Sequence, residues 1–310
     1  MNATNLKKVK PKINKGDLIF YCTFLAWPVL QFCVFYIGVN FNSIIMSFKS
    51  AETNKVNFDN FKWVFRFMSG ADGQGFPGLL SVTIRGYFIT TLISTPLGLL
   101  FAYYIYKKHF GWSAFRVILF LPGIISGVVI ALIFRWFITS YIPALIPSVG
   151  NLFAGEVFSK TAFPMMMFYC IWISFGANVL MYSNKMSAIP VEIIESAHLD
   201  GAIGFKEFWY IVMPNTFSTL SVFLVTGIAG LFTNQFGAYD LYQGKSVAEF
   251  KSVGYFFFVN VKQLSAELIK NDSVPVLRRY AALGIVLTII TIPLAFTLRW
   301  ATERFGPSED

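Results

Sequence analysis

The sequence predicts an all-α integral membrane protein. Of its 310 residues, 55% are hydrophobic and only 13% are charged, whereas soluble domains carry roughly a quarter charged residues. A soluble fold of this length would therefore lack the polar side chains that its surface needs. In addition, six apolar stretches are long enough to cross the hydrocarbon core of a bilayer, which takes about 20 helical residues.

The first predicted span follows a lysine-rich segment, residues 1–17, which is expected to form a basic tail. The apolar run after this segment is too long for a cleaved signal sequence, so we expect an uncleaved span. The six spans are expected at Leu18–Val39, Val82–Tyr106, Val117–Ile138, Thr161–Met181, Phe217–Tyr239 and Tyr280–Trp300.

The positions of the basic residues predict that both termini are cytoplasmic. An even number of spans places the two ends of the chain on one side of the membrane. Basic residues divide almost equally between the two sides, so the flanks and short loops of the first spans decide the orientation. The N-terminal lysine cluster and the short turn with Lys107, Lys108 and Arg116 favour termini on the inside.

The composition also excludes several other classes of protein. An apolar sequence with three cysteines is neither disordered nor a disulfide scaffold. Cys22, Cys33 and Cys170 lie in apolar runs and are interpreted as small hydrophobic residues, and two histidines alone do not make the usual zinc site. The net charge of +9 could indicate nucleic acid, but the 35 phenylalanines favour lipid as the partner.

Two longer loops on the predicted outer side contain apolar segments. From Phe58 to Phe67, aromatic residues recur at helical spacing, which predicts an amphipathic helix on the membrane or the bundle. The apolar run from Tyr255 to Val261 is too short to span a bilayer. We expect it to form a helix packed at the interface.

The inner loop between the fourth and fifth spans is expected to form two short helices. Pro190 suits the first position of a helix, and Gly201 can end that helix in a left-handed conformation. A second helix is expected from about Phe205 to Val212, with Pro214 ending it before the fifth span. Two short helices joined by a sharp turn form a compact knob suited to docking against another protein.

This loop resembles the EAA loop of ATP-binding-cassette (ABC) importer permeases. In that family three residues separate Glu-Ala-Ala from Gly, and nine more residues separate this Gly from Ile-x-Leu-Pro. Ser196 and Met213 replace the usual Ala and Leu, and the Asp-Gly-Ala form is usual in the sugar-importing branch. The matching residues here are Glu195, Ser196, Ala197, Asp200, Gly201, Ala202, Ile211 and Pro214.

The resemblance covers roughly residues 20 to 300. Over this range the chain resembles the MalF-type or LplB-type subunit of binding-protein-dependent carbohydrate importers. Phe115-Arg116 followed by Leu121-Pro122 also matches sugar permeases. The resemblance implies a six-span type I ABC importer transmembrane domain. Its parts would be the tail 1–17, the first span and outer loop 18–80, the core permease domain 81–300 with coupling loop 185–216, and a cytosolic tail 301–310.

The resemblance also implies the partners of the chain. A second homologous permease subunit would complete the pathway in a bacterial plasma membrane, and an extracytoplasmic solute-binding protein would deliver the carbohydrate. An ABC ATPase dimer would bind the coupling loop, where Glu195 would form a salt bridge or helix-terminus contact and Asp200 would orient the turn. No Gly-x-x-x-x-Gly-Lys-Ser/Thr phosphate loop occurs, so no cofactor is expected here, and ATP and Mg²⁺ are expected on the ATPase.

Polar residues within the spans are the candidates for a sugar pathway, because unpaired polar groups are costly in a bilayer. A continuous fifth helix would place Thr226, Gly230, Thr233 and Gly237 on one face. Helix packing through small residues is the alternative interpretation. The candidate pathway residues are Asn178, Tyr182, Thr226, Gly230, Thr233, Asn234 and Gln235.

Other functions remain open on the sequence alone. An ion-coupled half of a secondary transporter would need ionisable residues within the spans, and these are nearly absent. A permease for another solute, such as glycerol phosphate, would share the loop motif. A membrane-embedded enzyme would need a catalytic cluster, which is not recognisable, and a scaffold would not need six spans.

Overall fold

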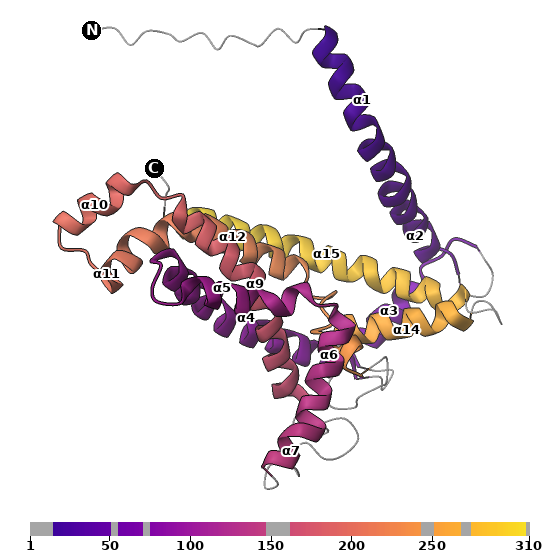
Figure 1. Cartoon of the computed structure of the whole chain (residues 1–310). Helices are drawn as coiled ribbons and strands as arrows, with labels where there is room; N and C mark the ends of the chain where they lie inside the picture. The colour runs from indigo at the N-terminus through magenta and orange to yellow at the C-terminus, as the bar shows by residue number, and fades with distance from the viewer. Residues whose placement is uncertain are drawn as a thin grey trace.

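The computed structural model describes residues 15–50, 55–70, 75–146, 162–242, 251–267 and 274–307. Within these ranges the chain folds into helices joined by turns (Figure 1). Six of the described helical segments are long and apolar enough to cross a membrane. The predicted all-α membrane fold is confirmed.

Of the first three spans, the first and the third each contain a π-helical turn. The first consists of α1 (Lys15–Gln31), η1 (Phe32–Gly38) and α2 (Val39–Ser47). The second is the single helix α4 (Phe76–Tyr106). The third consists of α6 (Gly127–Trp136), η2 (Phe137–Tyr141) and α7 (Ile142–Leu145).

The last three spans enclose the inner loop. The fourth is α9 (Ala162–Ser187). The fifth runs without interruption through α11 (Phe205–Glu207), η3 (Phe208–Val212) and α12 (Met213–Ala229). The sixth is α15 (Val274–Phe305).

The third span differs from the prediction of one helix over Val117–Ile138. Helix α5 (Trp112–Ile124) ends at Ile125, whose backbone is extended (φ −71°, ψ 143°), and α6 begins at Gly127. Pro122 lies close to this break, and a proline removes a backbone donor and crowds the preceding turn. The apolar sequence continues through the break, which is why hydropathy alone did not reveal it.

The fifth span is displaced towards the N-terminus relative to the predicted Phe217–Tyr239. Pro214 does not end a helix, because the π-helical turn η3 leads directly into it and accommodates its ring. At the other end α12 stops at Ala229, and positive φ values at Phe236 (52°) and Gly237 (68°) mark the turns that follow. The predicted helical face through Thr226, Gly230, Thr233 and Gly237 is therefore wrong.

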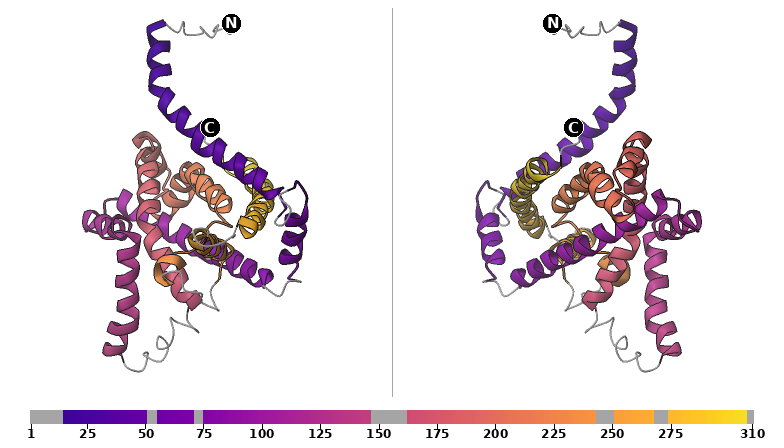
Figure 2. Two further views of the ribbon diagram at one scale, coloured as in Figure 1. Left: turned by 90° about the vertical axis from the view of Figure 1, so that its right-hand side faces the viewer. Right: turned by 90° about the vertical axis from the view of Figure 1, so that its left-hand side faces the viewer.

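Helices α4, α5, α9, α12 and α15 form the body of the molecule (Figure 1). Helix α9 packs along α4 and α5, and α12 packs on α15. The first span leaves this body: α1 projects away from the other helices, and only its continuation α2 packs against α15 (Figures 1 and 2). The apolar surface of α1 is consequently open to lipid or to another subunit.

Two helices cover the end of the bundle opposite the inner loop, as predicted from their apolar patterns. Helix α3 (Asp59–Met68) buries Val64 and Phe67 against α4 and α15, which confirms the amphipathic helix. Helix α14 (Val253–Glu267) contacts α4 and α15, and the short α13 (Ala238–Tyr242) packs against α6. The Thr83 hydroxyl on α4 accepts a hydrogen bond from the Val253 backbone N–H at 2.8 Å.

Candidate functional site

The inner loop begins with a helix and a sharp glycine turn, as predicted. Helix α10 (Val191–Leu199) has Pro190 as its N-cap residue, one position earlier than expected. Gly201 has a φ of +77°. The N–H of Gly201 donates to the His198 carbonyl at 3.0 Å, and that of Ala202 donates to the Ala197 carbonyl at 2.8 Å. These two bonds form a Schellman motif, whose left-handed residue is ordinarily glycine.

One face of α10 packs on the bundle and the other is exposed. Ile194 and Ala197 are buried, and Ile194 joins a cluster with Phe208 and Val212 of the fifth span. Glu195, Ser196 and Asp200 are exposed. The predicted contact residue Glu195 is thus free to meet another protein.

The remaining matched residues of the loop lie nearer the bundle. Ala202, Ile211 and Pro214 are half-buried. Ile211 accepts a hydrogen bond at its carbonyl from the Asn215 amide at 2.7 Å. These residues are therefore less accessible to a docking partner than Glu195, Ser196 and Asp200.

The loop presents an exposed apolar surface. Leu199, at the end of α10, is 91% exposed, and Phe205, after the turn, is 71% exposed. Exposed apolar groups gathered beside charged ones mark protein interaction sites. We call this the loop surface, and its members are Val191, Ile193, Leu199, Ile203, Phe205, Trp209 and Tyr210.

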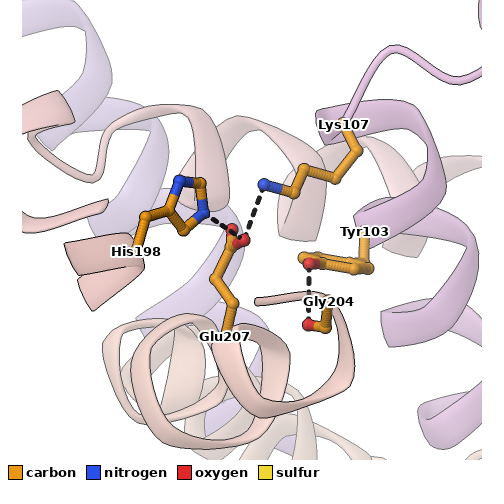
Figure 3. A network of polar contacts seen from close by, with 5 residues as sticks. All are labelled: Tyr103, Lys107, His198, Gly204 and Glu207. Atoms are coloured by element: carbon orange, nitrogen blue, oxygen red, sulfur yellow. Dashed lines mark hydrogen bonds and ion pairs between the residues drawn. The ribbon is translucent and has the colours of Figure 1, made fainter. Parts of the chain in front are cut away.

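A buried carboxylate connects the loop to the second span (Figure 3). The side chain of Glu207 on α11 is 0% exposed, and its Oε2 accepts hydrogen bonds from Lys107 Nζ at 2.7 Å and His198 Nε2 at 2.9 Å. A second link joins the same elements, since the Tyr103 hydroxyl donates to the Gly204 carbonyl at 3.0 Å. Burial removes water that would otherwise compete for these bonds and screen the charges.

Sequence reasoning missed this network. Lys107 was informative only as a basic flank of the second span, and it lies 100 positions before Glu207. The available signal was the position of Glu207 itself, a charged residue beside Phe208 on the side of α11 and η3 that packs inward.

A cavity of about 450 Å³ lies between α4, α9 and α12 and the turn after α12. Its volume is within the range of small-molecule sites, about 300–1,000 Å³. Of the predicted pathway residues, Asn178, Tyr182, Thr226 and Asn234 line it. Gly230, Thr233 and Gln235 do not line it, although the turn after α12 in which they lie brings Asn234 and Gly237 to the cavity.

Hydroxyl groups that were not predicted form much of the cavity wall. Thr90, Thr91, Ser94 and Thr95 face it from α4, and Ser174 faces it from α9. The hydroxyls of Ser94 and Ser174 lie 3.4 Å apart across the two helices. Four hydroxyl residues within six positions of an apolar span were the signal that could have revealed this wall.

A packed cluster connects the cavity to the loop. Tyr182 lines the cavity and is also buried in the cluster that includes Ile194 of α10 and Phe208 of η3. Thr226 lines both this cavity and a second one of about 500 Å³ between α12 and α15. Cavities thus run along α12 from the middle of the span towards its loop end, and the second one is mainly apolar, with Arg299 and Glu303 of α15 in its wall.

The chemistry of the cavity suits a neutral polyhydroxylated ligand. Hydroxyl and amide groups can donate and accept hydrogen bonds at once, and Tyr182 and Phe223 add aromatic surface. Among the described residues that line it, none is Lys or Arg. The chain therefore offers hydrogen bonds but no fixed positive charge at this site.

Several proteins of similar sequence are permeases of transport systems. MsmF, a multiple sugar-binding transport system permease of Streptococcus mutans, is 26% identical over 67% of this chain and 73% of its own length. AraP, an arabinooligosaccharides transport system permease of Bacillus subtilis, is 26% identical over 87% of this chain and 84% of that protein. UgpA, an sn-glycerol-3-phosphate transport system permease of Agrobacterium fabrum, is 23% identical over 79% of this chain and 82% of that protein.

A solved structure has the same fold. A chain of a bacterial ABC transporter that imports the acidic polysaccharide alginate superposes with a TM-score of 0.71, at 19% identity, over 94% of this chain and 96% of that chain. Residues 94–309 match the family described as the binding-protein-dependent transport system inner membrane component, a range that contains the loop, the buried network and all of the cavity lining except Thr90 and Thr91. The chain is a multi-pass membrane protein that belongs to this family.

Proposed function

We propose that this chain is a permease subunit of an ATP-driven, binding-protein-dependent importer and that its cargo is a neutral carbohydrate. The single observation that carries the substrate class is the cavity lined by hydroxyl and amide groups. Relatives named for multiple sugars and for arabinooligosaccharides support the same class.

The loop surface is the proposed docking site for an ABC ATPase dimer, which would carry ATP and Mg²⁺. Its exposed apolar side chains, together with Glu195, would seat in a groove of the ATPase as a coupling helix. Closure of the ATPases would then rock the spans around the cavity between inward-open and outward-open states. A second homologous permease would supply the other half of the pathway, making a heterodimer.

The proposed orientation places the loop, both termini and the Lys107–Lys108 turn in the cytoplasm of a bacterial cell. In that orientation the basic residues at the end of α4 and the N-terminal lysines obey the positive-inside rule. Helices α3 and α14 would face the extracytoplasmic side, where a solute-binding protein delivers the ligand.

Glycerol 3-phosphate is the second candidate cargo, because UgpA is among the relatives. A phosphate within the bilayer would be expected to meet a cationic partner, and the described lining of the cavity contains neither Lys nor Arg. The contribution of this chain therefore favours a neutral sugar.

The substrate class is tested by calorimetric titration of the cognate solute-binding protein. We expect binding of arabinooligosaccharides or maltooligosaccharides and no binding of glycerol 3-phosphate or alginate oligosaccharides. Binding of an anionic ligand alone would overturn the neutral-sugar assignment while leaving the permease function in place.

A further inference from the structure

We propose that Glu207 is a positioning residue that transmits movement of the docked loop to the helices lining the cavity. This inference rests on the proposed import function and adds a specific mechanical link to it. The carboxylate of Glu207 holds together three elements: the loop helix α10 through His198, the second span through Lys107, and its own fifth span.

The geometry concentrates this link on one atom. Oε2 of Glu207 accepts both hydrogen bonds, at 2.7 Å from Lys107 and at 2.9 Å from His198, although the two donors come from elements far apart in sequence (Figure 3). The Lys107 side chain is 25% exposed and that of Glu207 is 0% exposed. A charge-assisted bond at this depth is short and stronger than one between neutral groups.

The surroundings of Lys107 hold its ammonium group in place. Nζ lies 5.9 Å from the ring centroid of Tyr103 and 5.8 Å from that of Tyr106, both one turn or less away on α4. Cation–π attraction acts at such distances. The Tyr103 hydroxyl also donates a hydrogen bond to the Gly204 carbonyl. Gly204 has a φ of 64° and a ψ of −117°, a backbone conformation that suits glycine.

Continuous helices lead from this network to the cavity. From Lys107, α4 runs back without a break to Thr95 and Thr91, which line the cavity. From Glu207, η3 and α12 run on to Thr226, which lines it from the opposite helix. Because helices are stiff along their axes, displacement of α10 by an ATPase would shift the two cavity walls together through Glu207.

The alternative is that the network only stabilises the loop. Breaking a buried ion pair leaves one charge unpaired, so a purely structural role predicts loss of folded protein or of ATPase docking. A transmission role predicts a different result. The complex should still assemble, because the loop surface and the cluster around Ile194 and Phe208 are unchanged, but ATP hydrolysis should drive less transport.

The experiment compares Glu207→Gln, Lys107→Met and Lys107→Arg in the complete transporter, made with its second permease, ATPase and loaded solute-binding protein. Measured quantities are copurified ATPase, ATP hydrolysis, and uptake of a labelled maltooligosaccharide or arabinooligosaccharide that the binding protein takes. We expect normal copurification and hydrolysis for Glu207→Gln and Lys107→Met, with sugar transported per ATP reduced about tenfold. Lys107→Arg, which keeps the charge and the donor, should stay near wild type.

Two further variants complete the test. Exchanging the charges, Lys107→Glu with Glu207→Lys, should recover part of the transport lost in either single reversal. Lys62→Met removes the exposed outer pair with Asp59, whose side chains are 73% and 58% exposed, and should change nothing. The proposal would be overturned if Glu207→Gln transported as much sugar per ATP as the wild type. It would also be overturned if the variants lost ATPase copurification to the same extent as they lost transport. Absence of ATP-driven uptake by the wild-type complex would instead contradict the import function itself.

Discussion

The backbone of Gly176 on α9 lies directly against that of Leu119 on α5. A Cβ atom at Gly176 would lie 2.7 Å from the Leu119 carbonyl oxygen and 2.8 Å from the Cα atom of Phe120. Both neighbours are backbone atoms, so a side chain could be accommodated only by separating the helices. Small residues permit such close helix contacts in membranes, and this one positions α9, which carries Asn178 and Tyr182 to the cavity.

Gly176→Val should therefore destabilise the folded permease by about 1–3 kcal/mol or more, the usual cost of overpacking. The measurement is the thermal unfolding midpoint of the detergent-purified protein. Gly123→Val is the matched control, because a Cβ atom at that α5 position has no neighbour within 4 Å. Equal unfolding midpoints for Gly176→Val and the wild type would refute the close packing of α5 and α9.

Gly201→Val should uncouple ATP hydrolysis from transport while leaving the protein in the membrane. A Cβ atom at Gly201 would meet nothing within 4 Å, so the penalty comes from the φ of +77° rather than from a clash. A β-branched residue in that conformation costs of order 1–3 kcal/mol, which would open the Schellman turn. Transport and ATP hydrolysis are measured in the reconstituted complex.

Gly201→Asn provides the control for this prediction. Asparagine adopts the left-handed conformation more readily than other non-glycine residues, so this variant should retain most of the coupling. If Gly201→Val transports as efficiently as Gly201→Asn, the turn geometry does not matter for coupling.

Asn178→Ala should lower sugar uptake about tenfold, the effect of leaving one or two ligand hydrogen bonds unmade. Assembly and ATPase copurification should be unchanged, since Asn178 lines the cavity and is not part of the buried clusters. Asn184→Ala, on the same helix but exposed and away from the cavity, is the control. Uptake kinetics that match between these two variants would remove Asn178 from the pathway.

Leu199→Asp should abolish copurification of the ATPase, because Leu199 is 91% exposed at the tip of α10 and a charge there would be desolvated on docking. Phe110→Asp is a comparable change in the turn between α4 and α5, where the side chain is 99% exposed outside the loop surface. We expect the ATPase to copurify with the Phe110 variant. Equal retention by both variants would exclude the loop surface as the docking site.

The sequence predicted the number of spans and the loop turn correctly because both depend on local chemistry. Apolar runs of the right length predict membrane helices, and a glycine at position 201 predicts a left-handed helix end. The break at Ile125 was not predicted because apolar sequence continues past it. The end of α12 at Ala229 was not predicted because the polar residues Thr233, Asn234 and Gln235 were interpreted as part of a continuing helix.

The candidate site was only partly predictable for a related reason. Asn178 was found as a polar residue within a span, whereas Asn234 and Gln235 were both placed by assuming that the fifth helix continues past Ala229, and only Asn234 lines the cavity. The ion pair of Lys107 and Glu207 joins positions 100 residues apart. Such pairs depend on how helices pack, which residue spacing in one chain does not encode.

The most direct test of the import function is ATP-driven accumulation of sugar in proteoliposomes. The vesicles contain this chain, its second permease and the ATPase, with ATP inside and loaded solute-binding protein outside. We predict accumulation of the labelled oligosaccharide that requires both ATP and the binding protein and is lost in Gly201→Val while hydrolysis continues. Accumulation driven by a proton or sodium gradient in vesicles lacking the ATPase would contradict the proposed function.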